Sequence, residues 1–534
     1  MLLAGLAVVL ALVLWAWGRR LGGAGSGGAR RGPWGLVLRH WLALRVLGRA
    51  AGWQRRHLEQ ASKDVRRSQE HLLLRLQGGA GAAEPGTGAG HRGGFHRPLP
   101  RRGGAVAGRA GEIHRLVSGC PGSVSISLSL PAQGPVLYLD VLRRVFPEAL
   151  RPRGTARFSW ARGCSLPAAA WPLPTLYCAP EEAGAVPSRA AALYVQLLFA
   201  LRERALRALE AGLVSELYDA LGVLRAGWQG LAQDLASGRL SPRLELPEGT
   251  RAECARGWDG VARRLWPRLQ VVVAAEPSGE QLYGEALRES ECRGLPFYCP
   301  FYGAAGALLG VNLWPEQPDS RYLLCPGWAF CEFLPAGPGA EGPPETVLLA
   351  DVQEGQEYEL VLTAQAGLSR CPLSCHLPTP CAPHHSPTPR HPHTPLQTLS
   401  VRGEGVPEER FYQSLRRAVA MWPGARLVDY VCAESSLLGA SSGACAPHYQ
   451  VFVELRGVRD LSEAQRYKLD QCLQEDFPVY KTFRLKGSIG PVRLHLVAAG
   501  AFRELRDAAG PLGPMARVLR ESRPLHFIQS RVVS

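Results

Sequence analysis

Lysine is scarce in this chain of 534 residues, which has 61 basic residues but only four lysines, at positions 63, 468, 481 and 486. A phosphate-binding loop between residues 63 and 468 would therefore lack the ammonium group that usually contacts the phosphates. The net charge of +15 comes from arginine. Because no motif of a known nucleic-acid module accompanies these arginines, we interpret them as a solvated basic surface and expect no nucleic-acid partner.

Cysteine pairs with two-residue spacing are absent, and the 14 cysteines are irregularly spaced. This pattern indicates neither a disulfide framework nor a standard zinc module, so most cysteines are expected to be free and buried. Hydrophobic residues make up 46% of the chain and charged residues 20%. Such a composition excludes a chain that is disordered throughout and a membrane protein with many spans. The length predicts two or three domains.

An uncharged, apolar segment, residues 1–18, opens the sequence. It is just long enough to span a bilayer, and Arg19 and Arg20 follow it directly. A cleavable signal peptide usually carries its positive charge before the apolar run, whereas here the charge comes after it. We therefore predict an uncleaved membrane anchor with the rest of the chain in the cytoplasm, and keep a cleaved signal as the alternative.

Hydrophobic periodicity predicts a large block of mixed helices and strands before residue 371. Leucines recur every three or four residues over Ala190–Leu235, which predicts continuous helix. The apolar run Leu269–Ala275 is typical of a buried parallel strand, and Glu357–Thr363 alternates like a half-buried strand. Further expected elements are a helix at Leu36–Leu76 and strands at Val124–Leu130, 308–313 and 322–334. We assign 19–111 to a basic helix with a Gly/Pro/Arg-rich linker and 112–370 to a large α/β domain.

A segment rich in proline and histidine, Cys371–Thr398, interrupts this pattern. It contains eight prolines, five histidines and three cysteines. Because a segment of this composition cannot bury an apolar face, we predict an irregular insert over 371–399. Its cysteine and histidine spacings match no standard zinc module, so we assign no metal-binding residue there and keep a metal site only as the lesser alternative.

The sequence pattern of residues 400–534 predicts a smaller α+β domain. The predicted helices are Phe411–Met421, Leu461–Phe477 and Ala501–Ala508, and the predicted strands are His448–Leu455 and Val492–Val497. A hydrolase triad built on His448 with a serine and an aspartate is a weaker interpretation. We expect His448 to cap its strand at the surface.

Six segments after about residue 193 carry a family resemblance. They are 228–238 (WQGLAQDLASG), 302–313 (YGAAGALLGVNL), 330–335 (FCEFLP), 349–360 (LADVQEGQEYEL), 487–491 (GSIGP) and 500–505 (GAFREL). Together they resemble the Gretchen-Hagen-3 family of acyl acid amido synthetases, whereas residues 1–190 match that family poorly. The resemblance implies an acyl-adenylate-forming superfamily fold, with a large N-terminal α/β domain and a small C-terminal α+β domain. Here that fold would follow the N-terminal apolar anchor helix.

The resemblance also implies a chemistry. Family members activate a carboxylic acid with ATP and Mg²⁺ and pass the acyl group to an amino acid. Tyr302 stands where the family has its tyrosine, but Ala304, Ala305 and Gly306 stand where two serines and a metal-binding glutamate are expected. These three residues supply no side-chain donor, acceptor or charge. A site without the carboxylate would hold MgATP weakly.

The remaining motif positions are altered as well. The nearest candidate for a phosphate loop, Ser118–Ser123, has no lysine, and Pro121 removes one N–H donor. The ribose-binding aspartate expected after Arg370 is not visible, because the proline- and histidine-rich segment begins there. A mispredicted exon stays open as an explanation of that segment. The family lysine of the small domain corresponds roughly to Arg517, with Arg520 as the alternative.

These substitutions predict a non-catalytic member of an acid–amino acid ligase family, serving as a membrane-anchored binding or scaffold protein. No catalytic or metal-binding residue and no cofactor is assigned, and Tyr302, Gly303, Ala304, Ala305 and Arg517 are the cofactor-binding positions that the resemblance implies, in degenerate motifs. The alternative is an active ligase that joins a carboxylic acid to an amino acid with ATP and Mg²⁺. Any acyl pocket would lie against the helices of 190–235, whose leucines favour an apolar carboxylate. The expected location is the endoplasmic reticulum membrane and nuclear envelope, with the secretory lumen or cytoplasm as alternatives.

Overall fold

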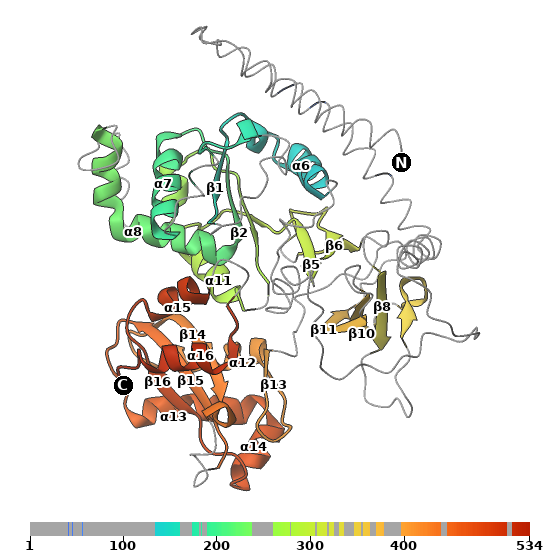
Figure 1. Ribbon diagram of the computed structural model, residues 1–534, viewed down its shortest axis with the longest axis vertical. Coiled ribbons are helices and arrows are strands. Elements are labelled where there is room, and N and C mark those ends of the chain that lie inside the picture. The colour runs from blue at the N-terminus through green and yellow to red at the C-terminus, as the bar shows by residue number, and fades with distance from the viewer. Residues whose placement is uncertain are drawn as a thin grey trace, which may run out of the picture. The chain divides into compact units, whose positions relative to one another are not determined.

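The computed structural model divides into two compact units (Figure 1). Unit 1 takes in residues 1–119, 123–276 and 283–390, and unit 2 takes in 120–122, 277–282 and 391–534. The described residues are 41, 45, 56, 134–160, 174–180, 183, 189–237, 260–277, 279–304, 307–317, 320–324, 330–335, 346–353, 356–363, 370–378, 397–438, 446–509 and 515–534. The predicted anchor at 1–18, the loop Ser118–Ser123 and the predicted strand Val124–Leu130 lie outside them. Within the described ranges, no helix has both the length and the apolar character needed to cross a membrane.

Unit 1 is built around a four-stranded parallel sheet in the order β1-β2-β3-β4. The strands are β1 (Thr155–Phe158), β2 (Ala208–Leu213), β3 (Val271–Ala275) and β4 (Phe297–Tyr298). All five residues of β3 are buried, as expected for a strand covered on both faces. The prediction of a buried parallel strand at 269–275 is therefore confirmed.

Helices cover both faces of this sheet. The elements are α6 (Gly134–Val145), α7 (Arg189–Arg202), α8 (Val214–Ser237), α10 (Val261–Leu265) and α11 (Gln281–Glu289), with short 3₁₀ turns at Pro147–Leu150 and Pro174–Leu176. Val271 and Val273 of β3 share a core cluster with α6. Val272, one position along, packs with the leucines of α7 and α8. Because alternate residues of a strand point to opposite faces, unit 1 has helix, sheet and helix layers.

The prediction of continuous helix over 190–235 is wrong in its middle, where β2 replaces the helix. Leu206, Leu209 and Leu213 stand at helical spacing, which hides the strand from a periodicity argument. In the fold, β2 pairs with β1 on one side and β3 on the other, and Leu209 is fully buried between the layers. Pairing on both edges therefore outweighs the helical preference of leucine and alanine.

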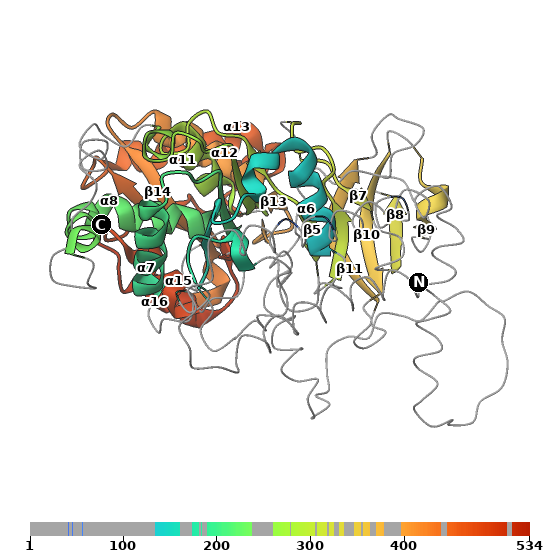
Figure 2. The ribbon, with the colours of Figure 1, turned by 90° about the horizontal axis from the view of Figure 1, so that it is seen from above.

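Two antiparallel sheets complete unit 1 (Figure 2). The smaller contains β5 (Phe301–Ala304), β6 (Ala307–Val311) and β7 (Leu323–Leu324). The larger, in the order β11-β10-β8-β9, contains β8 (Phe330–Pro335), β9 (Val347–Leu348), β10 (Glu357–Thr363) and β11 (Arg370–Pro378), with a 3₁₀ turn at Leu349–Asp351. The predicted strand at 357–363 matches β10, and the predicted strands near 308–313 and 322–334 correspond to β6, β7 and β8.

The prediction of an irregular insert over 371–399 is wrong for its first part, because β11 runs to Pro378. This strand pairs with β10 from Thr363↔Arg370 to Glu357↔Pro378. It occupies the edge of its sheet, where the side of the strand that faces away from the ladder tolerates proline. Pairing also satisfies the backbone groups along the outer edge of β10. Residues 379–396 lie outside the described part of the chain.

Unit 2 contains a four-stranded sheet in the order β16-β15-β14-β17. Its strands are β14 (Arg426–Glu434), β15 (Tyr449–Arg456), β16 (Arg493–Leu496) and β17 (Val518–Leu519), and a separate ribbon joins β12 (Thr398–Leu399) to β13 (Val406–Pro407). Its helices are α12 (Glu408–Ala420), α13 (Glu463–Asp476), α14 (Pro478–Leu485), α15 (Ala501–Ala509) and α16 (Ser522–Gln529), with a 3₁₀ turn at Ser435–Leu438. The predicted helices and strands of this domain are confirmed, but the inner strand β14 and the elements β12, β13, β17, α14 and α16 were not predicted.

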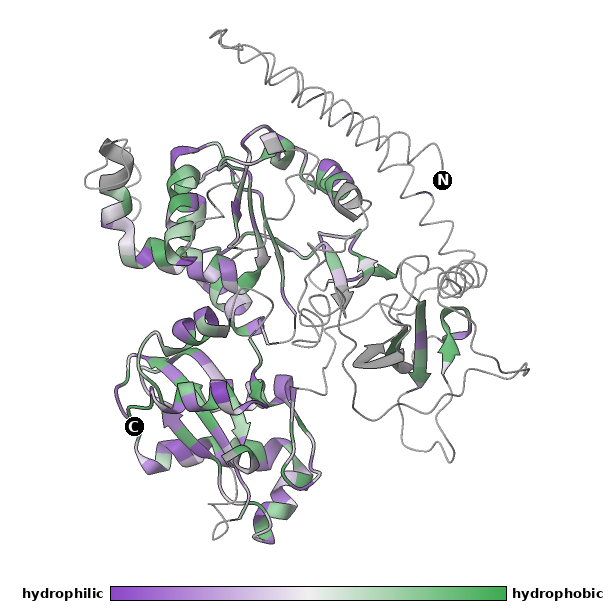
Figure 3. Ribbon diagram, viewed as in Figure 1, coloured by the Kyte–Doolittle hydropathy of each residue, from purple (hydrophilic) through white to green (hydrophobic). Residues whose placement is uncertain are grey.

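The two faces of the unit 2 sheet carry different helices. Tyr430 and Cys432 of β14 belong to the cluster that contains buried residues of α12, α13 and α14. Val431, between them, belongs to the cluster built from α15 and α16. Because strand side chains alternate, α12–α14 cover one face and α15–α16 the other. Figure 3 shows hydrophobic residues along these strands.

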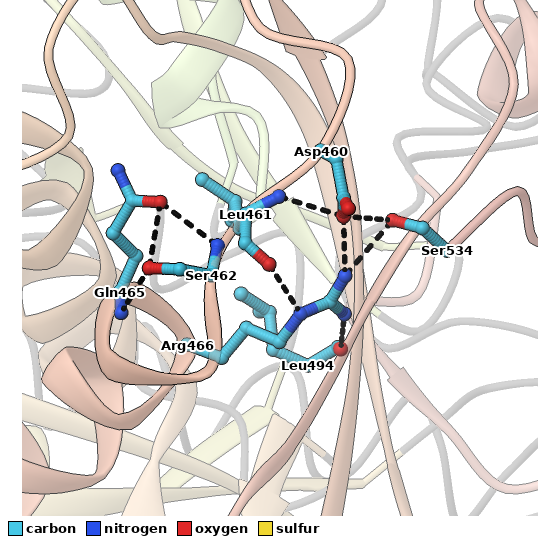
Figure 4. A network of polar contacts seen from close by, with 7 residues as sticks. All are labelled: Asp460, Leu461, Ser462, Gln465, Arg466, Leu494 and Ser534. Carbon is cyan, nitrogen blue, oxygen red and sulfur yellow. Dashed lines mark hydrogen bonds and ion pairs between the residues drawn. The ribbon is translucent and has the colours of Figure 1, made fainter.

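Arg466 of α13 forms hydrogen bonds to three other segments of unit 2 (Figure 4). Arg466 donates to the carbonyl of Leu494 in β16 at 2.6 Å and to the side chains of Asp460 and Ser534, each at 2.9 Å. Ser462 caps the same helix in a reciprocal capping box with Gln465, which satisfies backbone donors at the start of α13. Since these groups bond to one another, the network holds the last residues of the sequence against the sheet.

A matched pair of leucines tests the core of unit 2. Leu415 of α12 is fully buried, whereas Leu485 of α14 is 76% exposed. We expect Leu415→Ala to lower the free energy of unfolding by about 2–5 kcal/mol, because it removes buried methyl groups and leaves a cavity. Leu485→Ala should change it by less than about 0.5 kcal/mol. Urea denaturation of the two variants measures both values, and equal losses would contradict this packing.

Candidate functional site

The altered family motif lies in one hairpin of unit 1. Tyr302, Gly303 and Ala304 belong to β5, where Gly303 pairs with Leu308 and Ala304 with Ala307. Tyr302 is buried, and its ring lies 5.6 Å from that of Tyr322 in a core cluster. Ala305 lies outside the described residues. The structure thus places three of the predicted positions on one strand, with the tyrosine ring packed in the core.

The other predicted position, Arg517, belongs to unit 2 and is fully buried. Its Nε donates to the carbonyl of Gly279 at 2.7 Å, and its Nη1 donates to the carbonyl of Tyr430 at 2.8 Å. Nη1 also forms an ion pair with Asp429, and the guanidinium lies 4.8 Å from the centre of the Tyr430 ring. Protein groups therefore engage the cation that the resemblance assigns to the nucleotide.

Asp429 is shared between two arginines. Arg506 of α15 reaches its second carboxylate oxygen at 2.6 Å, so one buried carboxylate joins the helix to the segment before β17. Glu454 of β15 lies close by and accepts the N–H of Gly500 at 2.8 Å. Burial raises the pKa of Glu454, and the neighbouring Asp429 carboxylate raises it further. The cluster is thus a buried arrangement of paired charges at the centre of the unit.

A small surface pocket lies beside this cluster, entirely within unit 2. Its lining residues are Pro277, Gly279, Gln281, Leu282, Glu408, Glu409, Tyr412 and Tyr430. Tyr430 lines the pocket and also contacts Arg517 of the cluster. Its hydroxyl donates to Glu408, and its ring stacks on the ring of Tyr412, with 5.6 Å between the ring centres. Burial, and then the Glu408 carboxylate, raise the pKa of Tyr430. Two glutamates and no arginine or lysine line the pocket, so its lining favours a ligand with hydrogen-bond donors over a phosphate.

The alternative equivalent, Arg520, is half-exposed and pairs with Glu434 at 2.7 Å. Its second Nη donates to the carbonyl of Thr398 in β12. Arg520 therefore ties the β12–β13 ribbon to the end of β14.

Sequence reasoning missed a buried carboxylate in unit 1. Glu210 of β2 accepts hydrogen bonds from Tyr138 at 3.0 Å and Tyr177 at 3.2 Å, and Arg157 lies 3.6 Å away. Burial raises the pKa of Glu210. A lone glutamate within a buried strand would have been the signal, but the helix prediction over this segment concealed it. With three partners, the carboxylate links β1, β2 and α6.

The prediction that His448 caps its strand at the surface is wrong, because His448 is 4% exposed. Its Nδ1 lies 3.1 Å from the carbonyl of Ala446, and its backbone N–H donates to Ser435 at 3.0 Å. Burial lowers the pKa of His448. Residues 439–443 have the Gly-x-Ser-x-Gly spacing of a nucleophile elbow but lie outside the described residues. An elbow leads from a strand into a helix, whereas the next element here is the strand β15.

The shared carboxylate gives a direct test of the cluster. We expect Asp429→Asn to lower the free energy of unfolding by about 3–5 kcal/mol, because it removes the carboxylate that pairs with two buried guanidinium groups. Glu475→Gln is the matched control, since Glu475 pairs with Arg417 at the surface and should contribute less than about 1 kcal/mol. Chemical denaturation compares the two, and a neutral Asp429→Asn variant would refute the structural role of the cluster.

Sequence models of three domains of one protein family match this chain. The sequence model of the GH3 family N-terminal domain matches residues 164–297, that of the GH3 family central domain matches 322–375, and that of the GH3 family C-terminal domain matches 409–513. Residues 302–305, which contain the degenerate motif, lie between the first two matches. The second match ends inside β11.

Individual proteins agree with these matches. The human GH3 domain-containing protein is 42% identical over 519 residues, covering 94% of each chain, and its mouse counterpart is 38% identical, also at 94% of each. The indole-3-acetic acid-amido synthetase GH3.3 of Arabidopsis thaliana is 28% identical over 67% of this chain and 65% of its own length. The solved structure of the GH3.15 acyl acid amido synthetase superposes with a TM-score of 0.66 at 21% identity, over 79% of this chain and 85% of that chain. The chain therefore belongs to the GH3 family, a family of acid–amino acid ligases.

Proposed function

We propose that this GH3 family member is a non-catalytic protein, held at a membrane by residues 1–18 and acting as a binding or scaffold protein. The observation that carries the proposal is the position of Arg517. Its guanidinium is fully buried and is bound by Asp429, Gly279 and Tyr430. Such a group cannot reach a phosphate unless these bonds break, and breaking a buried ion pair is costly.

The residues present do not fit ATP and Mg²⁺. Ala304, Ala305 and Gly306 offer neither a carboxylate for the metal ion nor hydroxyl groups for the phosphates. The small pocket of unit 2 presents Glu408 and Glu409 instead of cations. No catalytic step through a nucleotide is therefore assigned to these residues.

The second candidate is an active ligase that joins a carboxylic acid to an amino acid. The names of the plant relatives favour it, since indole-3-acetic acid-amido synthetases are 28–30% identical over about two thirds of this chain. Fold and family alone do not establish an activity, however, because activity depends on the site. If the chain binds a ligand, the proposed class is an apolar carboxylate.

Nucleotide binding separates the two candidates. We expect the full chain, purified in detergent, to give no saturable heat with MgATP up to about 1 mM, which corresponds to a binding free energy weaker than about −4 kcal/mol. A plant GH3 synthetase measured in the same buffer is the positive control. Magnesium-dependent binding of ATP, or release of pyrophosphate that requires a carboxylic acid, would establish the ligase instead.

The proposed anchor has its own test, with the body of the protein facing the cytoplasm at the endoplasmic reticulum or nuclear envelope. We expect carbonate-washed membranes from expressing cells to retain the full chain with residues 1–18 intact, because the segment is uncharged and long enough to span. Replacing Leu10 and Leu12 by arginine should release the protein into the wash. Recovery of a soluble protein whose first residue lies beyond Gly18 would show a cleaved signal.

A further inference from the structure

Three of the four lysines of the chain lie within nineteen residues of one another, at 468, 481 and 486, on or next to α13 and α14 of unit 2. Elsewhere the chain uses arginine almost exclusively. Lys481 and Lys486 are exposed, and Lys481 stands four residues before Leu485, which places both on one face of α14. A lysine is a compact point charge on a flexible stem and does not need a planar partner.

Bulky apolar side chains accompany these lysines at the surface. Leu485 is 76% exposed, Val479 is 51% exposed and Tyr467 of α13 is 53% exposed. The two helices pack together, and Tyr467 is near enough to Arg484 to interact with it electrostatically. Tyr467, Val479, Lys481, Leu485 and Lys486 form what is here termed the α14 patch. In Figure 3, α14 carries both hydrophilic and hydrophobic residues.

Three of the four acidic residues of α13 pair with arginines, and the fourth, Glu463, is exposed in the first turn of that helix. Asp470 is buried and pairs with Arg484 at 3.0 Å, so this pair adds no net charge. Glu475 and Asp476, at the end of α13, both pair with Arg417. The patch itself contains Lys481 and Lys486 and no acidic residue, so its own side chains carry two positive charges.

We propose that the α14 patch docks unit 2 on an anionic membrane surface. Exposed leucine, valine and tyrosine side chains next to lysines suit an acyl–headgroup boundary, where the apolar groups insert and the ammonium groups meet lipid phosphates. Each lysine near such a surface strengthens binding about fivefold. The proposal concerns a second contact with the membrane and depends on the proposed anchor only for holding unit 2 nearby, where a tether raises the effective concentration.

Hydrogen exchange of the full chain in lipid nanodiscs tests this docking. In discs with 30% phosphatidylserine, we expect amides of residues 479–487 to exchange at least fivefold more slowly than in discs of phosphatidylcholine alone. Peptides from α15 and α16 serve as the internal control, because those helices cover the opposite face of the sheet. If the chain does not insert, the same discs are added to the free protein, and the same protection is expected.

Variants identify the groups responsible. Lys481→Gln combined with Lys486→Gln should reduce the binding by about 25-fold and abolish the protection, and Leu485→Ser should weaken it. Arg503→Gln combined with Arg523→Gln removes the same charge from exposed positions on the opposite face and should leave the protection intact. Thermal unfolding confirms that each variant is folded.

Two results would overturn the proposal. One is equal exchange of α14 in both kinds of disc, and the other is protection that survives the double lysine substitution. Protection that appears only with a protein fraction, and without anionic lipid, would assign the patch to a protein partner and would likewise refute membrane docking.

Discussion

The ion-paired cluster around Asp429 is the constraint on which unit 2 depends. One buried carboxylate holds Arg506 of α15 and Arg517 before β17, and Arg517 in turn binds the carbonyl of Gly279, far away in sequence. Burying three charged groups is costly unless each is paired. Once paired, the cluster fixes β14 against α15 and residues 277–282, so the cation assigned to the nucleotide becomes part of the structural core.

The adjoining pocket follows from the same arrangement. Tyr430 lies between Arg517 on one side and Tyr412 and Glu408 on the other. Glu408 and Glu409, at the start of α12, line the pocket together with Tyr430. A phosphate site usually presents cations or backbone N–H groups, whereas two glutamates and no arginine or lysine line this pocket. The burial of Arg517 is the observation that supports the proposed binding or scaffold function, and the lining of the pocket agrees with it.

Part of the fold could be predicted from the sequence, because β3, β10 and five elements of unit 2 have clear hydrophobic patterns. Two of the failures, at β2 and β11, share a cause, which is pairing between distant segments. In β2, leucines at helical spacing conceal a strand whose partners lie more than 40 residues away on either side. In β11, the prolines conceal an edge strand, which forms because its backbone pairs with β10. Local pattern carries no information about such partners.

The site could be predicted only in part. The resemblance led to Arg517, but its partners Asp429 and Gly279 could not be inferred, since 88 and 238 residues separate them from it. The loss of charge at 304–306 is visible in the sequence itself.

The central claim is that Arg517 is buried and held by protein groups. The rate at which each arginine reacts with a chemical reagent tests this claim most directly. A dicarbonyl reagent that modifies guanidinium groups, followed by peptide mass spectrometry, reads each arginine separately in the folded chain. The buried position of Arg517 predicts that it stays unmodified while exposed Arg402 and Arg523 react, and that MgATP changes none of the three. Rapid modification of Arg517 that MgATP suppresses would contradict this account and show a cation available to the nucleotide.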